Sequence, residues 1–331
     1  MARSTARRRG RRGVWVLVLA GLVVVAGAGL VWQLGLGPLP DPEGCTATVG
    51  GRTVTLTTEQ AENAALISAI AVQRGLPARA ASIALATAYQ ESKIVNLEHG
   101  DRDSIGIFQQ RPSQGWGTRE QILDPVYSIN AFYDALVRIE GYRSMRITEA
   151  AQEVQRSGFP EAYEDHADDA RVLASALTGN SPGGRFTCVV RHSLEEEPDT
   201  LDKGGLTGRA AVVRRELEGV FGDLSLGGFA PGGVREGHMP GSTHYEGRAI
   251  DVFVRPINRA NKRQGWAMAY YLVAQAGRLG VDHVIFDNRI WSAGRRSEQG
   301  WRAYDPDTRG RPPAVRKVLE HRDHVHVDVV D

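Results

Sequence analysis

Histidine and aspartate residues gather in two short segments towards the end of this 331-residue sequence. One segment contains His244 and Asp251, and the other contains His326. A catalytic zinc ion is held by three nitrogen or oxygen ligands from the protein and keeps a fourth position open for water. The three residues supply such a set, so we predict that His244, Asp251 and His326 bind Zn²⁺.

Both segments have the pattern of β-strands, in which alternate side chains share a face. The run 249–254 is rich in β-branched residues and places Asp251 on the face opposite to them. In the run 324–329, His324 and His326 share one face, opposite three valines. Two imidazoles that lie two residues apart can therefore meet one ion and its water.

A second candidate for chemistry lies in the alanine-rich stretch 80–95, which has helical spacing. Ala84, Ala88 and Glu91 fall on one stripe of that helix. A carboxyl group that continues an apolar stripe is partly desolvated, as a general acid for glycoside cleavage requires. Glu91 is therefore a candidate catalytic acid, and the alternative is an ordinary surface glutamate at a helix end.

The residues around Glu91 carry a family resemblance. The triplet 90–92 reads Gln-Glu-Ser, and the segment 103–110 reads Asp-Ser-Ile-Gly-Ile-Phe-Gln-Gln. Together they resemble the lysozyme-like fold of soluble lytic transglycosylases and goose-type lysozymes, over about residues 57–178. The resemblance implies that Glu91 is the catalytic acid. The residues that it places along a glycan groove are Ser104, Gly106 and Gln109.

The same region departs from the transglycosylase pattern at one point. The usual segment with a tyrosine is replaced by residues 150–155, which contain none. Tyr163 or Tyr133 could substitute, and cleavage by the transglycosylase route, hydrolysis and mere glycan binding all stay open. Trp116, in a glycine-flanked loop, is a candidate platform for a sugar ring or, alternatively, a loop anchor.

The last part of the chain resembles zinc enzymes that act on cell-wall peptides. Residues 242–251 read Ser-x-His-x-x-Gly-x-Ala-x-Asp, and a histidine motif follows near the end. This is similar to D-alanyl-D-alanine carboxypeptidases and endolysin endopeptidases, and it implies the same three zinc ligands. Residues 280–302 also resemble a related carboxy-terminal domain of exported actinobacterial wall proteins. The resemblance spans about residues 206–331.

Two residues compete for the role of general base in that domain. The carboxypeptidases place a glutamate three positions before the last ligand, where this chain has Asp323, whereas other zinc wall peptidases use the histidine that is here His324. An offset of two keeps His324 on the ligand face, so we favour it and keep Asp323 as a base or as the partner that orients an imidazole. Arg235 and His238, in the preceding loop, could bind a substrate carboxylate or an oxyanion, or could be surface residues.

Residues 14–36 are almost entirely apolar, follow six arginines and predict a membrane-spanning segment. That length spans a bilayer, and the positive flank places the amino terminus in the cytoplasm. The alternative is a secretory signal cleaved near residues 26–28, and both readings export the rest of the chain. Without the six arginines the net charge falls from +1 to −5, which does not suit a nucleic-acid binder.

Two cysteines, Cys45 and Cys188, lie beyond that segment. In an oxidising compartment an isolated pair usually bonds, and this bond would enclose about 140 residues. The alternative is two separate buried thiols.

We therefore expect a multidomain protein. Its parts are a basic tail and transmembrane anchor (1–37), an all-α lysozyme-like domain (38–192), a linker (193–205) and an α+β zinc-peptidase-like domain with a small antiparallel sheet (206–331). The expected function is that of a membrane-anchored peptidoglycan-remodelling hydrolase, with glycan strands and stem peptides as partners and Zn²⁺ as cofactor. The rival is a non-catalytic peptidoglycan-binding scaffold that recruits other wall enzymes.

Overall fold

The computed structural model describes residues 41–195, 197–198 and 200–331 of the chain. The predicted basic tail and transmembrane anchor, residues 1–37, lie outside the described residues. Within the described part, none of the helices combines the length and the apolar character that a bilayer crossing needs. Residues 43–331 form one compact unit.

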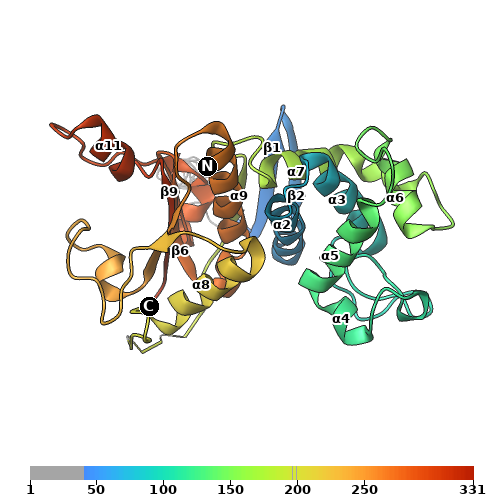
Figure 1. Ribbon diagram of the computed structural model, residues 1–331, viewed down its shortest axis with the longest axis horizontal. Coiled ribbons are helices and arrows are strands. Elements are labelled where there is room, and N and C mark those ends of the chain that lie inside the picture. Colours follow the sequence, from blue (N-terminus) through green and yellow to red (C-terminus); the bar gives the residue numbers. More distant parts are fainter. Residues whose placement is uncertain (1–40, 196, 199) are drawn as a thin grey trace, which may run out of the picture. The chain divides into compact units, whose positions relative to one another are not determined.

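Helices dominate the first half of that unit (Figure 1). Helix α2 (Thr58–Gln73) begins at Thr57, whose side chain accepts a hydrogen bond from the Gln60 amide while the Gln60 side chain accepts one from the Thr57 amide. This reciprocal cap is the helix start that the sequence indicates. Helix α3 (Ala78–Ser92) is lined with alanines, which allow close packing against α2 and α7. The other helices of this half are α4 (Arg119–Leu123), α5 (Pro125–Leu136), α6 (Ile147–Gln155) and α7 (Ala167–Leu177).

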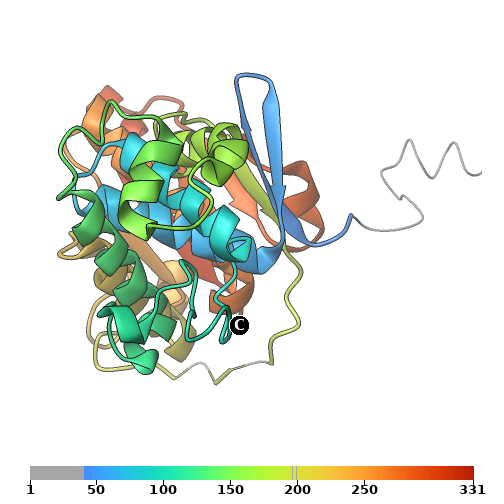
Figure 2. The ribbon, with the colours of Figure 1, turned by 90° about the vertical axis from the view of Figure 1, so that its right-hand side faces the viewer.

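Residues 38–192 also contain strands, in contrast to the all-α expectation. Strands β1 (Gly44–Val49), β2 (Arg52–Leu56) and β3 (Phe186–Val189) form an antiparallel sheet in the order β2-β1-β3. The blue hairpin of β1 and β2 is prominent in Figure 2. Its turn is made by two glycines with positive φ, Gly50 and Gly51, a backbone that favours glycine.

The predicted disulfide between Cys45 and Cys188 is confirmed. The two residues lie directly opposite each other in the register of β1 and β3, with 4.0 Å between their Cα atoms. Both are buried, and the bond closes a sequence separation of 143 residues.

The second half is built on a six-stranded antiparallel sheet in the order β4-β5-β9-β6-β7-β8. Its strands are β4 (Leu226–Gly227), β5 (Ala249–Phe253), β6 (Val281–Phe286), β7 (Arg289–Ser292), β8 (Arg302–Ala303) and β9 (His324–Val329). Its helices are α8 (Gly208–Phe221), α9 (Arg259–Ala274), α10 (Ala276–Leu279) and α11 (Pro313–Leu319). Helix α9 packs on β6 and β9, and α8 contacts β5 and β9. The valines of β9 are buried, which leaves its alternate polar side chains on the other face.

The two halves pack directly against each other, because α2 contacts α9 and β3 contacts α9 as well. Two indole N–H groups of the second half donate to carbonyls of β3: Trp291 to Cys188 at 3.1 Å and Trp301 to Phe186 at 2.8 Å. The segment 193–205, expected as a linker, thus joins halves that share hydrogen bonds and apolar contacts.

Candidate functional site

The pairing of β5 with β9 brings the three predicted metal ligands together. Asp251 and His326 lie opposite each other in the register, and His244 stands in a short 3-10 helix just before β5. His244 Nε2 lies 3.1 Å from His326 Nδ1 and 3.2 Å from Asp251 Oδ1, and the last two atoms are 3.1 Å apart. All three side chains are less than 10% exposed. The set that the sequence predicts therefore converges on one point.

The hydrogen bonds behind the two imidazoles fix which ring nitrogens face that point. His244 Nδ1 donates to the Gly228 carbonyl at 2.7 Å, because a carbonyl can only accept. His326 Nε2 faces the Asp328 carboxylate at 3.5 Å, and in the neutral ring whose Nδ1 lone pair is open to a cation it donates to that carboxylate. In the neutral rings, two nitrogen lone pairs and a carboxylate oxygen of Asp251 then face one another. Three acceptors at such distances repel unless a proton or a cation lies between them.

The pKa shifts of His326 and Asp251 agree with this arrangement. Burial alone would lower the pKa of His326, but hydrogen bonds and charge from Asp251 and Asp328 raise it to about 9. Burial would raise the pKa of Asp251, yet hydrogen bonds with His244 and His326 hold it well below its ordinary value. Both shifts reflect a potential that favours positive charge at this point, so these residues could hold a metal ion.

Close approach of backbone and ligand requires glycine at residue 228. Gly228 has φ +80°, and a Cβ atom there would lie 2.2 Å from the Cε1 atom of His244. Its carbonyl could not then orient His244 in the same way. Gly228 thus belongs to the support of the site.

Asp328 supports His326, the third predicted ligand. Its Oδ1 atom accepts from the backbone N–H of His283 at 2.8 Å and from His283 Nδ1 at 3.0 Å, and its Oδ2 atom accepts from Thr243 Oγ1 at 3.2 Å. Burial would raise the pKa of Asp328, but hydrogen bonds from His283 and His326 lower it. Asp282, His283 and Asp328 themselves form a group whose ligand atoms lie within 4.8 Å. Because Asp328 already accepts these bonds and is the member of the group that contacts His326, we assign Asp328 the role of orienting His326.

The two candidates for the base occupy different positions. His324 Nδ1 donates to Asp323 Oδ1 at 2.8 Å, and His324 Nε2 lies 3.7 Å from Asp251 Oδ1. The second oxygen of Asp323 accepts from Arg255 Nε at 2.7 Å. Burial would raise the pKa of Asp323, but the bonds from His324 and Arg255 lower it. Asp323 thus orients the imidazole, and the free nitrogen of His324 faces the centre.

Arg255 is a site residue that the sequence analysis missed. Its guanidinium lies 4.1 Å from the centroid of the Phe253 ring while it binds Asp323. No motif spacing marks it, although it follows β5 by two residues, which is a weak signal in retrospect. His321 is similar: its ring lies 4.5 Å from that of His324, and its Nδ1 donates to the Leu319 carbonyl at 3.0 Å.

The two loop residues proposed for substrate binding differ in place. The ring of His238 stacks on that of His244, with 3.9 Å between centroids. Ligand atoms of His238, His244 and Asp251 lie within 4.8 Å of one another. Arg235 is exposed. The structure therefore brings His238, of the two, to the candidate metal centre.

In the first half, Glu91 is half-buried at the end of α3 and has a tyrosine partner. Tyr163 Oη donates to Glu91 Oε1 at 2.7 Å, and burial raises the pKa of Tyr163, so it stays a donor. Tyr133, the other candidate, is buried and donates to the Ile67 carbonyl. Tyr163 is therefore the one that meets Glu91.

Segment 104–110 is tied between α3 and α6. Ser92 Oγ, next to Glu91, donates to the Ile107 carbonyl at 2.7 Å, and Gln155 Nε2 from α6 donates to the Phe108 carbonyl at 2.8 Å. The predicted groove residues take part in folding this segment. Ser104 is buried, Gly106 has φ +77° with no room for a Cβ atom beside the Ile122 carbonyl, and Gln109 Nε2 donates to the His99 carbonyl at 3.4 Å.

A hollow of about 680 Å³ borders α5 and α6. Trp116, half-buried, lines it together with Gln155, the residue that binds the Phe108 carbonyl. The indole thus borders open space, as a sugar platform requires, and Gln155 is the lining residue that contacts the segment 104–110. Its remaining lining residues are Gln114, Ala135, Arg138, Ile139, Glu153, Val154 and Arg156.

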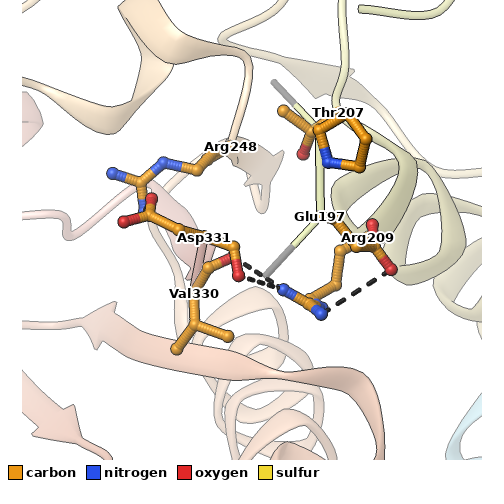
Figure 3. A pocket seen from close by; sticks show the side chains of 7 residues that line it. Glu197, Thr207, Arg209, Arg248, Val330 and Asp331 are labelled. Carbon is orange, nitrogen blue, oxygen red and sulfur yellow. Dashed lines mark hydrogen bonds and ion pairs between the residues drawn. The ribbon is translucent and has the colours of Figure 1, made fainter. Parts of the chain in front are cut away.

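A much smaller hollow, of about 10 Å³, lies where Arg209 and Arg248 meet the segment after β9 (Figure 3). Arg248 binds the Val329 carbonyl at 2.9 Å and the Asp331 carboxylate at 3.0 Å, and Arg209 binds the Val330 carbonyl at 3.3 Å. Space of that size admits no more than a water molecule. These contacts hold the end of β9 against α8. The same strand carries His324 and His326.

Comparison with protein families matches residues 202–314 to a family described as VldE, C-terminal domain. Comparison with curated proteins finds no match. The matched region contains His244 and Asp251 but ends before Asp323, His324 and His326. The match is consistent with the predicted resemblance to a carboxy-terminal domain of exported cell-wall proteins. The resemblances to lysozyme-like enzymes and to zinc peptidases stay predictions.

Proposed function

We propose that this chain is a peptidoglycan-remodelling hydrolase that residues 1–37 anchor in the membrane with the rest facing outward. Its second half would cleave stem peptides with the help of zinc, and its first half would cut or grip glycan strands. The observation that carries the peptidase half is the convergence of three acceptor atoms, from His244, Asp251 and His326, at 3.1–3.2 Å from one another.

The residues fit zinc in donor type, number and spacing. Zinc bonds of about 2.0–2.1 Å to nitrogen and oxygen separate tetrahedral ligand atoms by roughly 3.3–3.4 Å, close to the spacing seen. Each ligating imidazole also has an acceptor behind it, Gly228 for His244 and Asp328 for His326, as zinc-bound histidines usually do. When bound, zinc supplies Lewis-acid activation of a peptide carbonyl and of water.

The chain's own residues would then move the proton. The Nε2 atom of His324 would accept it from the attacking water and pass it to the leaving amine. Asp323 holds the Nδ1 proton of His324 and stabilises the imidazolium that forms, and Arg255 fixes Asp323 in turn. The half-buried Glu91 would serve as the acid of the glycan half, with its proton position set by Tyr163.

A wall-digestion assay tests both halves at once. Full-length protein loaded with Zn²⁺ is incubated with purified peptidoglycan, and the products are identified by mass. We expect Glu91→Gln to reduce sugar-terminated products and His324→Ala to reduce freed peptides, each by about 10²–10⁴-fold, with the other product class unchanged. Anhydro sugars would indicate the transglycosylase route and reducing ends would indicate hydrolysis. Full activity in either variant contradicts the assignment for that half, and a wild type that releases nothing supports the scaffold.

The role of Asp328 predicts a graded effect on metal affinity. In Asp328→Asn the side chain keeps its volume but loses the charge that orients His326, so we expect zinc affinity to fall about 10–100-fold. Competition with a chromogenic chelator measures it. The matched control is Asp282→Asn, because Asp282 is 37% exposed and contacts the same His283 from the outer side. Equal affinity in the Asp328 variant and the wild type would refute this role.

A further inference from the structure

We propose that His238 is a fourth, displaceable ligand of the metal centre, so that the centre is closed until the loop that carries His238 moves. The inference rests on the proposed metal site and concerns its regulation. A zinc site with four protein ligands is of the structural type, whereas a catalytic site keeps one position open. The position of His238 therefore decides whether the centre can act.

The imidazole of His238 lies beside two of the proposed ligands, His244 and Asp251. The ring of His238 covers the ring of His244 at 3.9 Å between centroids, with 26° between their planes. One ring nitrogen of His238, one ring nitrogen of His244 and one carboxylate oxygen of Asp251 lie within 4.8 Å of one another. For ligand atoms roughly 3.3–3.4 Å apart around zinc, the nitrogen of His238 has to approach by at most about 1.5 Å.

The loop that carries His238 is held by the hydroxyl group of Tyr245. Tyr245 Oη accepts from the backbone N–H of His238 at 3.1 Å and donates to the His238 carbonyl at 2.7 Å. Tyr245 follows His244 directly in the sequence, so the clamp and the ligand move as one piece. His238 is thus fixed by a single side chain that belongs to the zinc motif itself.

The loop that carries His238 also contains glycines that permit it to rearrange around Tyr245. Between β4 and the 3-10 helix of His244, Gly232, Gly233, Gly237 and Gly241 have φ between +78° and +93°, and a Cβ atom at three of these four glycines would meet no atom within 4 Å. Met239, beside His238, is 59% exposed. Glycine hinges and an exposed apolar tip permit the loop to swing as a unit when something engages its tip.

His324 is not the fourth ligand in this arrangement. The proposed function assigns its Nε2 atom, 3.7 Å from Asp251 Oδ1, the role of base, and the bond from its Nδ1 to Asp323, which Arg255 holds, fixes the ring there. His238 has no such restraint on its ring. When His238 leaves, water takes the fourth position on the metal, and His324 already lies beside that position. The device would keep a wall hydrolase inactive until substrate or a partner draws the loop away.

The test compares full-length wild type with His238→Ala and with the neighbouring control Met239→Ala. Zinc release into excess chelator is followed first. We expect His238→Ala to release zinc at least about tenfold faster, because one ligand is lost, and Met239→Ala to match the wild type. In the Co²⁺-substituted proteins, azide should change the visible spectrum of His238→Ala at once and that of the wild type weakly, since an open position binds a small anion.

Tyr245→Phe gives an independent variant that keeps every imidazole. Without its hydroxyl the clamp is lost, so we expect zinc release faster than in the wild type and spectral access for azide. Equal release rates and equal azide spectra in wild type, His238→Ala and Tyr245→Phe would overturn the role of His238 while leaving the three-ligand centre intact. A wild type that binds no metal would overturn both that role and the proposed peptidase function.

Discussion

His244→Ala should lose zinc. The variant removes one of the ligands whose nitrogen and oxygen atoms lie 3.1–3.2 Å apart, and its short side chain lets water enter beside Asp251. Structural zinc sites contribute roughly 10–16 kcal/mol, so one ligand of a small set is worth roughly 3–4 kcal/mol, or about 10²–10³-fold in affinity. Metal analysis of the purified protein after dialysis should find about one zinc per wild-type chain and much less in the variant.

The control for this experiment is His99→Ala, because His99 is exposed in the first half of the chain and far from the motif in sequence. It should keep the wild-type zinc content. Thermal unfolding gives a second measure: added Zn²⁺ should raise the midpoint of wild type and of His99→Ala, while His244→Ala should respond weakly, since a ligand stabilises only the state that binds it. Equal zinc content in His244→Ala and wild type would refute the assignment.

The convergence of the three proposed metal ligands was predictable because strand periodicity is local. A side chain's face follows from its position along a strand, so the sequence alone placed His324 and His326 together and Asp251 opposite apolar neighbours. The antiparallel register that sets Asp251 against His326 then completes the set. The spacing also predicted that the side chain of Asp323 points away from the ligand face. In the structure this side chain accepts a hydrogen bond from His324 Nδ1.

The contacts of the residues around the proposed ligands and around Glu91 were not predictable, because they depend on loop conformations and on residues distant in the sequence. Arg255 and His321 reach the centre through loop conformations that no local pattern encodes. His238 and Tyr163 were among the candidates, but the contact of His238 with His244 and that of Tyr163 with Glu91, across 72 residues, do not follow from spacing. Strand β3 joins the first sheet only through pairing with a distant strand. The hairpin of β1 and β2 was different: its Gly-Gly turn between runs rich in threonine and valine is a readable signal that the helical interpretation passed over.

The disulfide should carry a large part of the stability. The bond closes 143 residues, and the chain-entropy relation gives about 5 kcal/mol for a loop of that length. A protein with a total of about 5–15 kcal/mol would lose a third or more of it. We therefore expect Cys45→Ala with Cys188→Ala to unfold at markedly lower denaturant concentration than the wild type, measured by circular dichroism under equilibrium conditions.

The structure also predicts how the unfolding should look. Cys188 lies in β3, whose carbonyls accept from Trp291 and Trp301 of the second half, so loosening β3 exposes packing of both halves. We expect a single transition for far-ultraviolet and tryptophan signals rather than two. A phosphine reductant should lower the wild-type midpoint towards that of the double variant and leave the double variant unchanged. A loss below about 1 kcal/mol, or two separate transitions, would show that the halves do not depend on β3 in this way.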